Sequence, residues 1–262
     1  MNNFLNHPYH LVTMSPWPLI LSISLMNLMI SILELFFYKN FMLLVFNMFL
    51  MLLCMFQWWR DVIRESTFQG MHTINVVKGI YLGMILFIIS EVFFFISFFW
   101  GFFHMSLSPS IEIGLIWPPK GINSFDPYDI PMLNTVILLS SGVSITWSHN
   151  MMVLNKKFSS MMGLLITLVL GLYFSLVQIY EYNELSFSIS DSVYGSLFYM
   201  MTGFHGIHII VGSLFLLVSL IRMYSMHFSF NHFFCFEGSI WYWHFVDVVW
   251  LFLYLILYWW FN

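Results

Sequence analysis

Seven long runs of apolar side chains, separated by prolines, lysines or polar clusters, constrain the fold of this chain more than any other feature. A helix needs about 20 such residues to cross a hydrocarbon core of roughly 30 Å. Only 8 % of the 262 residues are charged and 60 % are hydrophobic, too few polar side chains for a water-facing surface. We therefore expect an all-α integral membrane protein with seven transmembrane helices, forming a single polytopic domain over residues 1–262. The predicted spans are roughly 16–38, 42–60, 76–105, 131–153, 159–180, 194–222 and 233–260.

Lysines and arginines are distributed unevenly over the two sides of these spans. The connections after spans two, four and six share the side of the N-terminus and carry Arg60, Arg64, Lys78, Lys156, Lys157 and Arg222. The opposite side carries only Lys39 and Lys120. Because basic connections stay on the inner side, we predict that the N-terminus lies inside and the C-terminus outside. This orientation argues against a G-protein-coupled receptor, whose N-terminus lies outside.

Glu91 is an acidic residue inside the third apolar run, ILFIISEVFFFISFFW. It follows Lys78 by about a dozen residues, which at 1.5 Å per residue places it near the middle of the membrane. A carboxyl group at that depth is a candidate functional site, because it is costly unless protonated or paired. The alternative is a neutral acid that only forms a hydrogen bond to a neighbouring helix.

Two polar stripes lie on the sixth and seventh spans. His205 and His208 are three residues apart and share a helix face. On the last span the stripe consists of Glu237, Trp241, His244 and Asp247. We expect the stripes to face each other or Glu91 in an intramembrane polar network. A metal site is the less favoured interpretation, because the Glu-x-x-His pairs of di-iron bundles are missing.

The segment QWWRDVIREST, at the end of the second span, gathers charges that are rare elsewhere. It contains two arginines and two acids, Arg60, Asp61, Arg64 and Glu65. The arginines share one helix face, and the acids form a parallel stripe. Trp58 and Trp59 place this turn at the depth of the lipid head groups. The arginines are suited to bind lipid phosphate; a salt-bridged helix end is the alternative.

Seven motifs, distributed over nearly the whole chain, are more specific. In order they are SPWPL (15–19), QWWRDVIREST (57–67), GMILFIISEV (83–92), WPPKGI (117–122), LLSSGVSITWSH (138–149), GFHGIHIIVGS (203–213) and WYWHFVDVVWLFLY (241–254). Their order and spacing resemble the cytochrome c oxidase subunit III family of the mitochondrial type.

The resemblance implies a core subunit of the respiratory oxidase, which passes electrons from cytochrome c to oxygen and pumps protons across the mitochondrial inner membrane. The family's chain has no catalytic residue and binds no metal; haem a, haem a3 and the copper centres belong to other subunits. It packs directly against subunit I, in a complex with subunit II and accessory subunits, and no nucleic acid is expected. Its N-terminal two-helix hairpin is splayed from a five-helix bundle, and phospholipids occupy the cleft. The N-terminus then lies in the matrix and the C-terminus in the intermembrane space.

The resemblance also implies roles for individual residues. Glu91 matches the family's carbodiimide-reactive glutamate. Positions near bound lipid head groups correspond to Arg60, Arg64, Glu65, His72 and Arg222, beside Trp58 and Trp59. The implied lipids are structural phospholipids such as cardiolipin or phosphatidylglycerol. The implied tasks are stabilising the oxidase, supporting proton uptake and guiding oxygen. The family often has a histidine pair after FQG, whereas Met71 precedes His72 here.

A stand-alone proton or solute transporter built around Glu91 is the competing interpretation. Transporters of this size often show internal repeats or paired broken helices, and the sequence shows neither. The chain also contains no alanine but 31 Phe and 20 Met, which is typical of a gene in an AT-rich organelle genome.

Overall fold

The described part of the chain consists of helices and turns. The computed structural model describes residues 8–10, 12–229 and 232–260, and within these ranges seven helices are long and apolar enough to cross a membrane. They are α1 (Trp17–Tyr38), α2 (Met42–Thr67), α3 (Ile74–Leu107), α4 (Ile130–Val153), α5 (Lys157–Glu184), α6 (Ser192–Tyr224) and α7 (Phe234–Leu253). A short 3-10 helix, η1 (Ile111–Ile113), precedes α4, and a π-helix, η2 (Tyr254–Trp259), continues α7. The all-α, seven-helix fold class is confirmed, whereas the orientation of the termini stays a prediction.

The helix ends differ from the predicted spans mainly at α2. The sequence predicts that the second span ends at residue 60, but the helix continues to Thr67. A span predicted from hydropathy ends where charged residues begin, because charged side chains lie outside the hydrocarbon core. A helix can extend beyond that point, because it depends only on its backbone hydrogen bonds. The Phe68 amide donates to the Arg64 carbonyl at 2.9 Å and closes the last turn. The charges of the QWWRDVIREST segment therefore project from a regular helix.

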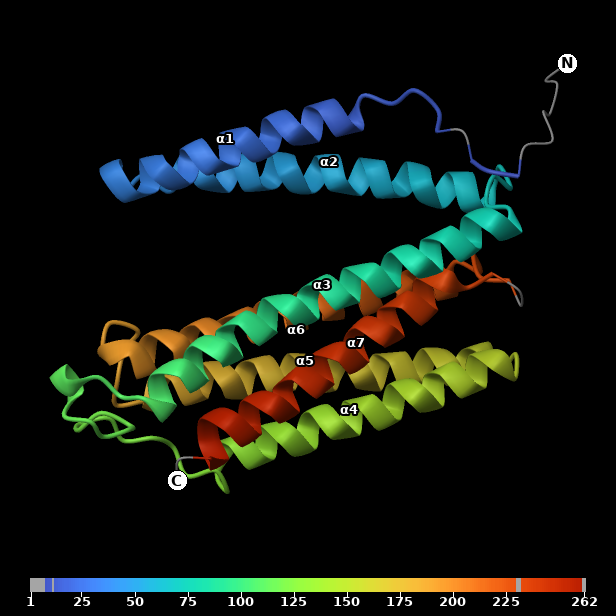
Figure 1. Cartoon of the computed structure of the whole chain (residues 1–262). Helices are drawn as coiled ribbons and strands as arrows, with labels where there is room; N and C mark the ends of the chain where they lie inside the picture. Colours follow the sequence, from blue (N-terminus) through green and yellow to red (C-terminus); the bar gives the residue numbers. More distant parts are fainter. Residues whose placement is uncertain (1–7, 11, 230–231, 261–262) are drawn as a thin grey trace, which may run out of the picture. The chain divides into compact units, whose positions relative to one another are not determined.

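The chain turns between α1 and α2 at Lys39, in the connection between the first two predicted spans. Lys39 has a φ of 54°, in the left-handed region that ends many helices. The Asn40 side-chain oxygen then accepts a hydrogen bond from the Met42 amide at 3.1 Å, where α2 begins. Figure 1 shows α1 and α2 side by side, and the buried Asn47 amide donates to the Asn27 carbonyl at 3.2 Å between them. The buried Asn47 amide is thus satisfied within the hairpin.

The chain divides into two compact units, with the border between Ile80 and Tyr81. The first unit contains the α1–α2 hairpin and the start of α3, and the second contains the rest of α3 with α4 to α7. The predicted separation of the hairpin from the other five helices, and the lipid cleft between them, stay predictions.

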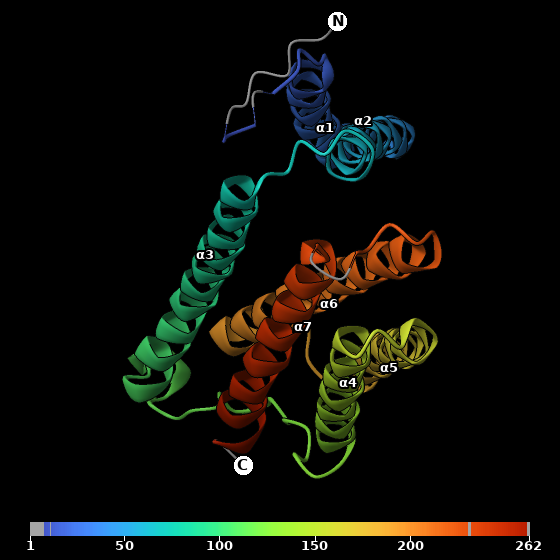
Figure 2. The same cartoon turned by 90° about the vertical axis from the view of Figure 1, so that its right-hand side faces the viewer.

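Trp243 of α7 is the centre of packing in the second unit. It is fully buried, and its indole Nε1 donates to the Ser141 hydroxyl oxygen on α4 at 2.9 Å. A Cβ added to Gly171 on α5 would lie 2.6 Å from the Trp243 ring, and one added to Gly212 on α6 would lie 3.1 Å from it. Glycines at these positions therefore let two further helices close around one large side chain. Figure 2 shows α5 beside α4 and α6 beside α7.

Candidate functional site

Glu91 on α3 and His208 on α6 contact each other inside the second unit. His208 Nε2 lies 2.9 Å from Glu91 Oε2. The His208 side chain is 12 % exposed and the Glu91 side chain 23 % exposed, so both are largely enclosed by the protein. Phe95 packs against the imidazole, with 5.1 Å between the ring centroids. The structure thus brings together the third-span acid and one of the two sixth-span histidines.

The other nitrogen of His208 restricts where protons can lie. Nδ1 is 2.6 Å from the Phe204 carbonyl oxygen, which can only accept, so Nδ1 carries a hydrogen. Two arrangements then satisfy Nε2: a neutral imidazole accepting from a protonated Glu91, or an imidazolium donating to a carboxylate. Both keep one proton between the two residues and no net charge. The pair can therefore hold a proton without placing a net charge in hydrocarbon.

His205 has a different partner from its neighbour on the predicted stripe. Its ring is buried, and Nε2 lies 3.2 Å from the Val246 carbonyl oxygen on α7. The rings of Phe174 and Trp250 pack against it, with centroids 5.6 Å and 5.2 Å away. His205 therefore connects α6 to α7.

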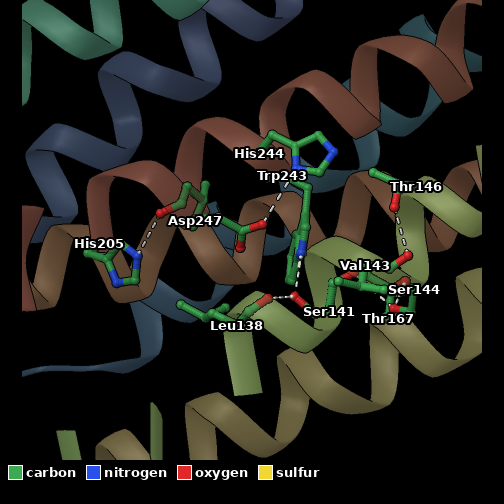
Figure 3. A network of polar contacts seen from close by, with 11 residues as sticks. Leu138, Ser141, Val143, Ser144, Thr146, Thr167, His205, Trp243, His244 and Asp247 are labelled. Carbon is green, nitrogen blue, oxygen red and sulfur yellow. Dashed lines mark hydrogen bonds and ion pairs between the residues drawn. The ribbon is translucent and has the colours of Figure 1, made fainter. Parts of the chain in front are cut away.

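The acids of α7 pair separately from the α3–α6 contact. Glu237 accepts a hydrogen bond from the Tyr81 hydroxyl and lies 3.8 Å from His149 Nε2 on α4. His244 Nδ1 lies 3.6 Å from Asp247 Oδ2 on the same helix. Figure 3 shows the Trp243 indole extending to Ser141, while the His244 ring points away from that bond. The predicted polar residues thus form several local contacts among the described residues.

Within residues 8–10, 12–229 and 232–260, no three His, Cys, Asp or Glu side chains lie close enough together to hold a metal ion.

A pocket of about 610 Å³ lies in the first unit, where the N-terminal segment meets the end of α2. Its lining includes His10, Thr13, Trp17, Trp58, Asp61, Arg64, Glu65, Gln69 and His72. The Trp17 indole donates to Asp61 Oδ2 at 2.6 Å, and His10 Nε2 lies 3.1 Å from Glu65 Oε2. Both acids therefore have partners within the unit. The Arg64 guanidinium, by contrast, makes no hydrogen bond or ion pair with any described side chain.

Three residues of the predicted lipid-binding set do not line this pocket. The Arg60 guanidinium donates to Asp61 Oδ1 at 3.1 Å, as the salt-bridged interpretation of this helix end predicts. Trp59 is 59 % exposed. Arg222 belongs to the second unit, where its guanidinium lies 4.9 Å from the centroid of the Phe228 ring. Asp61, Glu65 and Arg60 therefore have side-chain partners. Arg64 lines the pocket and makes no hydrogen bond or ion pair with any described side chain.

Sequence reasoning missed other polar residues of the site. Glu181 is fully buried on α5 and accepts a hydrogen bond from the Tyr258 hydroxyl. It lies one residue beyond the predicted end of the fifth span, so the search for intramembrane acids stopped short of it. Trp17 and His10 reach α2 over 44 and 55 residues of sequence, a distance at which no local pattern is informative.

Comparison with known proteins identifies the family. The family model described as cytochrome c oxidase subunit III matches residues 7–262. The chain belongs to this family. It is 55 % identical to cytochrome c oxidase subunit 3 of Aedes aegypti over the full length of both chains. It is 54 % identical to that of Drosophila melanogaster and 55 % identical to that of Locusta migratoria, over 99 % of each chain.

Membership of the subunit III family confirms the resemblance seen in the motifs. The chain is a subunit of complex IV, an oxidoreductase complex of the respiratory chain. With seven membrane-length helices it is a multi-pass membrane protein, and the family name implies the mitochondrial inner membrane.

Proposed function

We propose that this chain is the non-redox subunit that supports the catalytic core of the oxidase. It packs against subunit I, beside subunit II and accessory subunits, while haem a, haem a3 and copper are bound by other chains. Its own tasks are to hold structural phospholipid, to support proton uptake and to guide oxygen. Oxygen reduction and proton pumping then depend on this chain indirectly, because it stabilises the complex and supplies the catalytic subunit with protons and oxygen.

The unpaired Arg64 guanidinium in the pocket of the first unit is the observation that carries the lipid part of this proposal. A guanidinium fork matches the geometry of a phosphate group, and a charge-assisted hydrogen bond to phosphate is strong. Trp58 lines the same pocket and is suited to the boundary between head group and acyl chain. Since His10 and Trp17 already bind the two acids, the pocket fits an anionic phospholipid such as cardiolipin or phosphatidylglycerol.

The Glu91–His208 pair supports the proposed role in proton uptake. The pair holds one proton at no net charge, and passing that proton on would leave one negative charge on the pair until another proton arrives. The same pair would suit a stand-alone transporter built around Glu91. The full-length similarity to oxidase subunits favours the oxidase, because every relative named above is one of its subunits.

Purification of the intact complex tests the proposal. Under mild detergent, the chain is expected to copurify with haem-bearing partners, detected by optical spectroscopy and mass spectrometry, and with bound anionic phospholipid. Recovery of the chain alone, without a haem-bearing partner, would refute the assignment to the catalytic complex. Recovery within the complex but without phospholipid would refute only the lipid role.

A further inference from the structure

Three buried polar side chains lie together at the end of the second unit that contains η2. They are Asn134 on α4 and Gln178 and Glu181 on α5. Asn134 and Glu181 are fully buried, and Gln178 is 6 % exposed. The nitrogen and the oxygen of each amide, and Glu181 Oε2, make no hydrogen bond within the described part of the chain. Five buried polar atoms in this region therefore lack a partner.

The register of α4 and α5 brings these side chains together. The two helices are consecutive and lie side by side in opposite directions (Figure 2). The hydroxyl oxygens of Ser144 and Thr167 are 2.8 Å apart between them. Ten residues further along each helix, Asn134 comes level with residue 177, next to Gln178. Gln178 precedes Glu181 by one helical turn, and its amide approaches the carboxyl without reaching hydrogen-bond geometry.

The π-helix η2 encloses the same region from the side of α7. Tyr258 of η2 is buried, and its hydroxyl donates to Glu181 Oε1. The Tyr258 ring lies 6.1 Å, centroid to centroid, from the ring of Trp250, whose buried indole Nε1 also has no hydrogen-bond partner among residues 8–10, 12–229 and 232–260. π-Helices are rare and are frequent at functional sites. The unsatisfied groups thus lie where three elements meet.

Other polar side chains of the α4–α5 interface are satisfied by the protein. Ser141 donates to the Leu138 carbonyl at 2.6 Å, and Thr167 donates to the Gly163 carbonyl at 2.9 Å. A hydroxyl can bond in this way to the preceding turn of its own helix. A carboxamide also carries an acceptor oxygen, and the backbone N–H groups of its helix already bond within the helix. The amides of Asn134 and Gln178 therefore need a partner from outside their own helices.

The mixture of donors and acceptors selects the kind of partner. The amide nitrogens need acceptors, whereas the amide oxygens need donors. A cation would satisfy only the oxygens, an anion only the nitrogens, and an acyl chain neither. A water molecule both donates and accepts, and it satisfies Glu181 Oε2 whether the carboxyl is protonated or charged. A buried water makes about three hydrogen bonds, so five atoms correspond to about two water molecules.

We propose that Asn134, Gln178 and Glu181 bind a cluster of about two ordered water molecules inside the second unit. The cluster connects α4 to α5 and, through the hydrogen bond between Glu181 and Tyr258, to η2. The inference does not depend on the proposed function, because every group that it uses belongs to one unit of this chain.

Electron cryomicroscopy of the intact oxidase, at a resolution that shows single water molecules, tests the site. We expect separate density peaks within about 3.2 Å of the Asn134 amide, the Gln178 amide and Glu181 Oε2. Direct hydrogen bonds among these side chains without such density would overturn the proposal. Density for a cation bound only to the oxygens, or for an acyl chain, would overturn it as well.

Substitution of the amides by leucine gives a second test, because the sign of the effect is informative. An amide without any partner destabilises the protein, so its replacement by leucine would raise the melting temperature. An amide that binds water is lost together with its hydrogen bonds. We therefore expect Asn134→Leu and Gln178→Leu each to lower the melting temperature of this chain in the oxidase by about 2–6 °C.

Asn150→Leu is the matched control, because Asn150 is an exposed amide near the other end of α4. It is expected to leave the melting temperature unchanged. An unchanged or higher melting temperature in both Asn134→Leu and Gln178→Leu would contradict the water site. A direct bond between the two amides would also lower the melting temperature, and the density map distinguishes that arrangement from bound water.

Discussion

Arg64 is expected to hold an anionic phospholipid in the pocket of the first unit, and Arg64→Ala tests this directly. The structure leaves its guanidinium without an ion pair among the described residues, whereas Arg60 already donates to Asp61 at 3.1 Å and 3.3 Å. A hydrogen bond to a charged group contributes about 1.5–3 kcal/mol, so the variant should bind the lipid roughly 10- to 150-fold more weakly. Arg60→Ala should have a smaller effect, because a partly exposed ion pair contributes little and Arg60 does not line the pocket.

Phospholipid retained by the purified oxidase is the quantity to measure. The complex is washed with increasing detergent, and cardiolipin and phosphatidylglycerol are counted per complex by mass spectrometry. Lys39→Ala, at the other end of the α1–α2 hairpin, is the control for a lost positive charge. The reasoning is wrong if Arg64→Ala keeps the wild-type lipid content at every detergent concentration, or if Arg60→Ala loses more lipid than Arg64→Ala.

Three further changes test other contacts. Glu91→Gln should preserve assembly and most oxygen reduction, because the glutamine amide can donate to His208 Nε2 as a protonated acid would. Complete loss of turnover in an assembled complex would contradict this and indicate that the carboxylate is required. Gly171→Ala should destabilise the second unit by about 1–3 kcal/mol, seen as a lower melting temperature, since the added methyl would meet the fully buried Trp243. Asp191 accepts hydrogen bonds from the Ser188 amide and hydroxyl, which lower the pKa of its carboxyl by stabilising the charged form. The protection of this loop should therefore be present above the ordinary aspartate pKa of about 3.9 and be lost as the pH falls through the lower folded value, which amide exchange of Ser188 reports. An Asp191→Asn variant with unchanged exchange at neutral pH would contradict this.

The seven helices could be predicted because each depends on local information. A run of apolar residues long enough to cross a membrane must satisfy its own backbone hydrogen bonds, and a helix does so within the segment. The end of α2 could not be predicted from hydropathy. Its last turn contains Arg64 and Glu65, which mark the end of the hydrocarbon but are compatible with a helix.

The candidate site could be predicted only in part, because partners depend on how helices are rotated. The sequence indicates Glu91 and His208 as polar groups in apolar runs, and the structure places them 2.9 Å apart. It does not indicate that His205, on the same predicted stripe, faces a backbone carbonyl instead. Helical spacing of three residues separates side chains by about 300° around the axis, or 60° in the shorter direction, enough for neighbours to meet different helices.

Some polar side chains of this chain have a hydrogen-bond partner within the chain, and others have none among the described residues. The first kind stabilises the fold, whereas the second kind is available to bind a partner. Glu91 and Glu237 are satisfied within the second unit, by His208 and by Tyr81. Arg64 makes no hydrogen bond or ion pair with any described residue. It follows the tryptophans at the end of α2, the position at which the sequence predicts lipid head groups, so a phosphate is the partner that we expect for it.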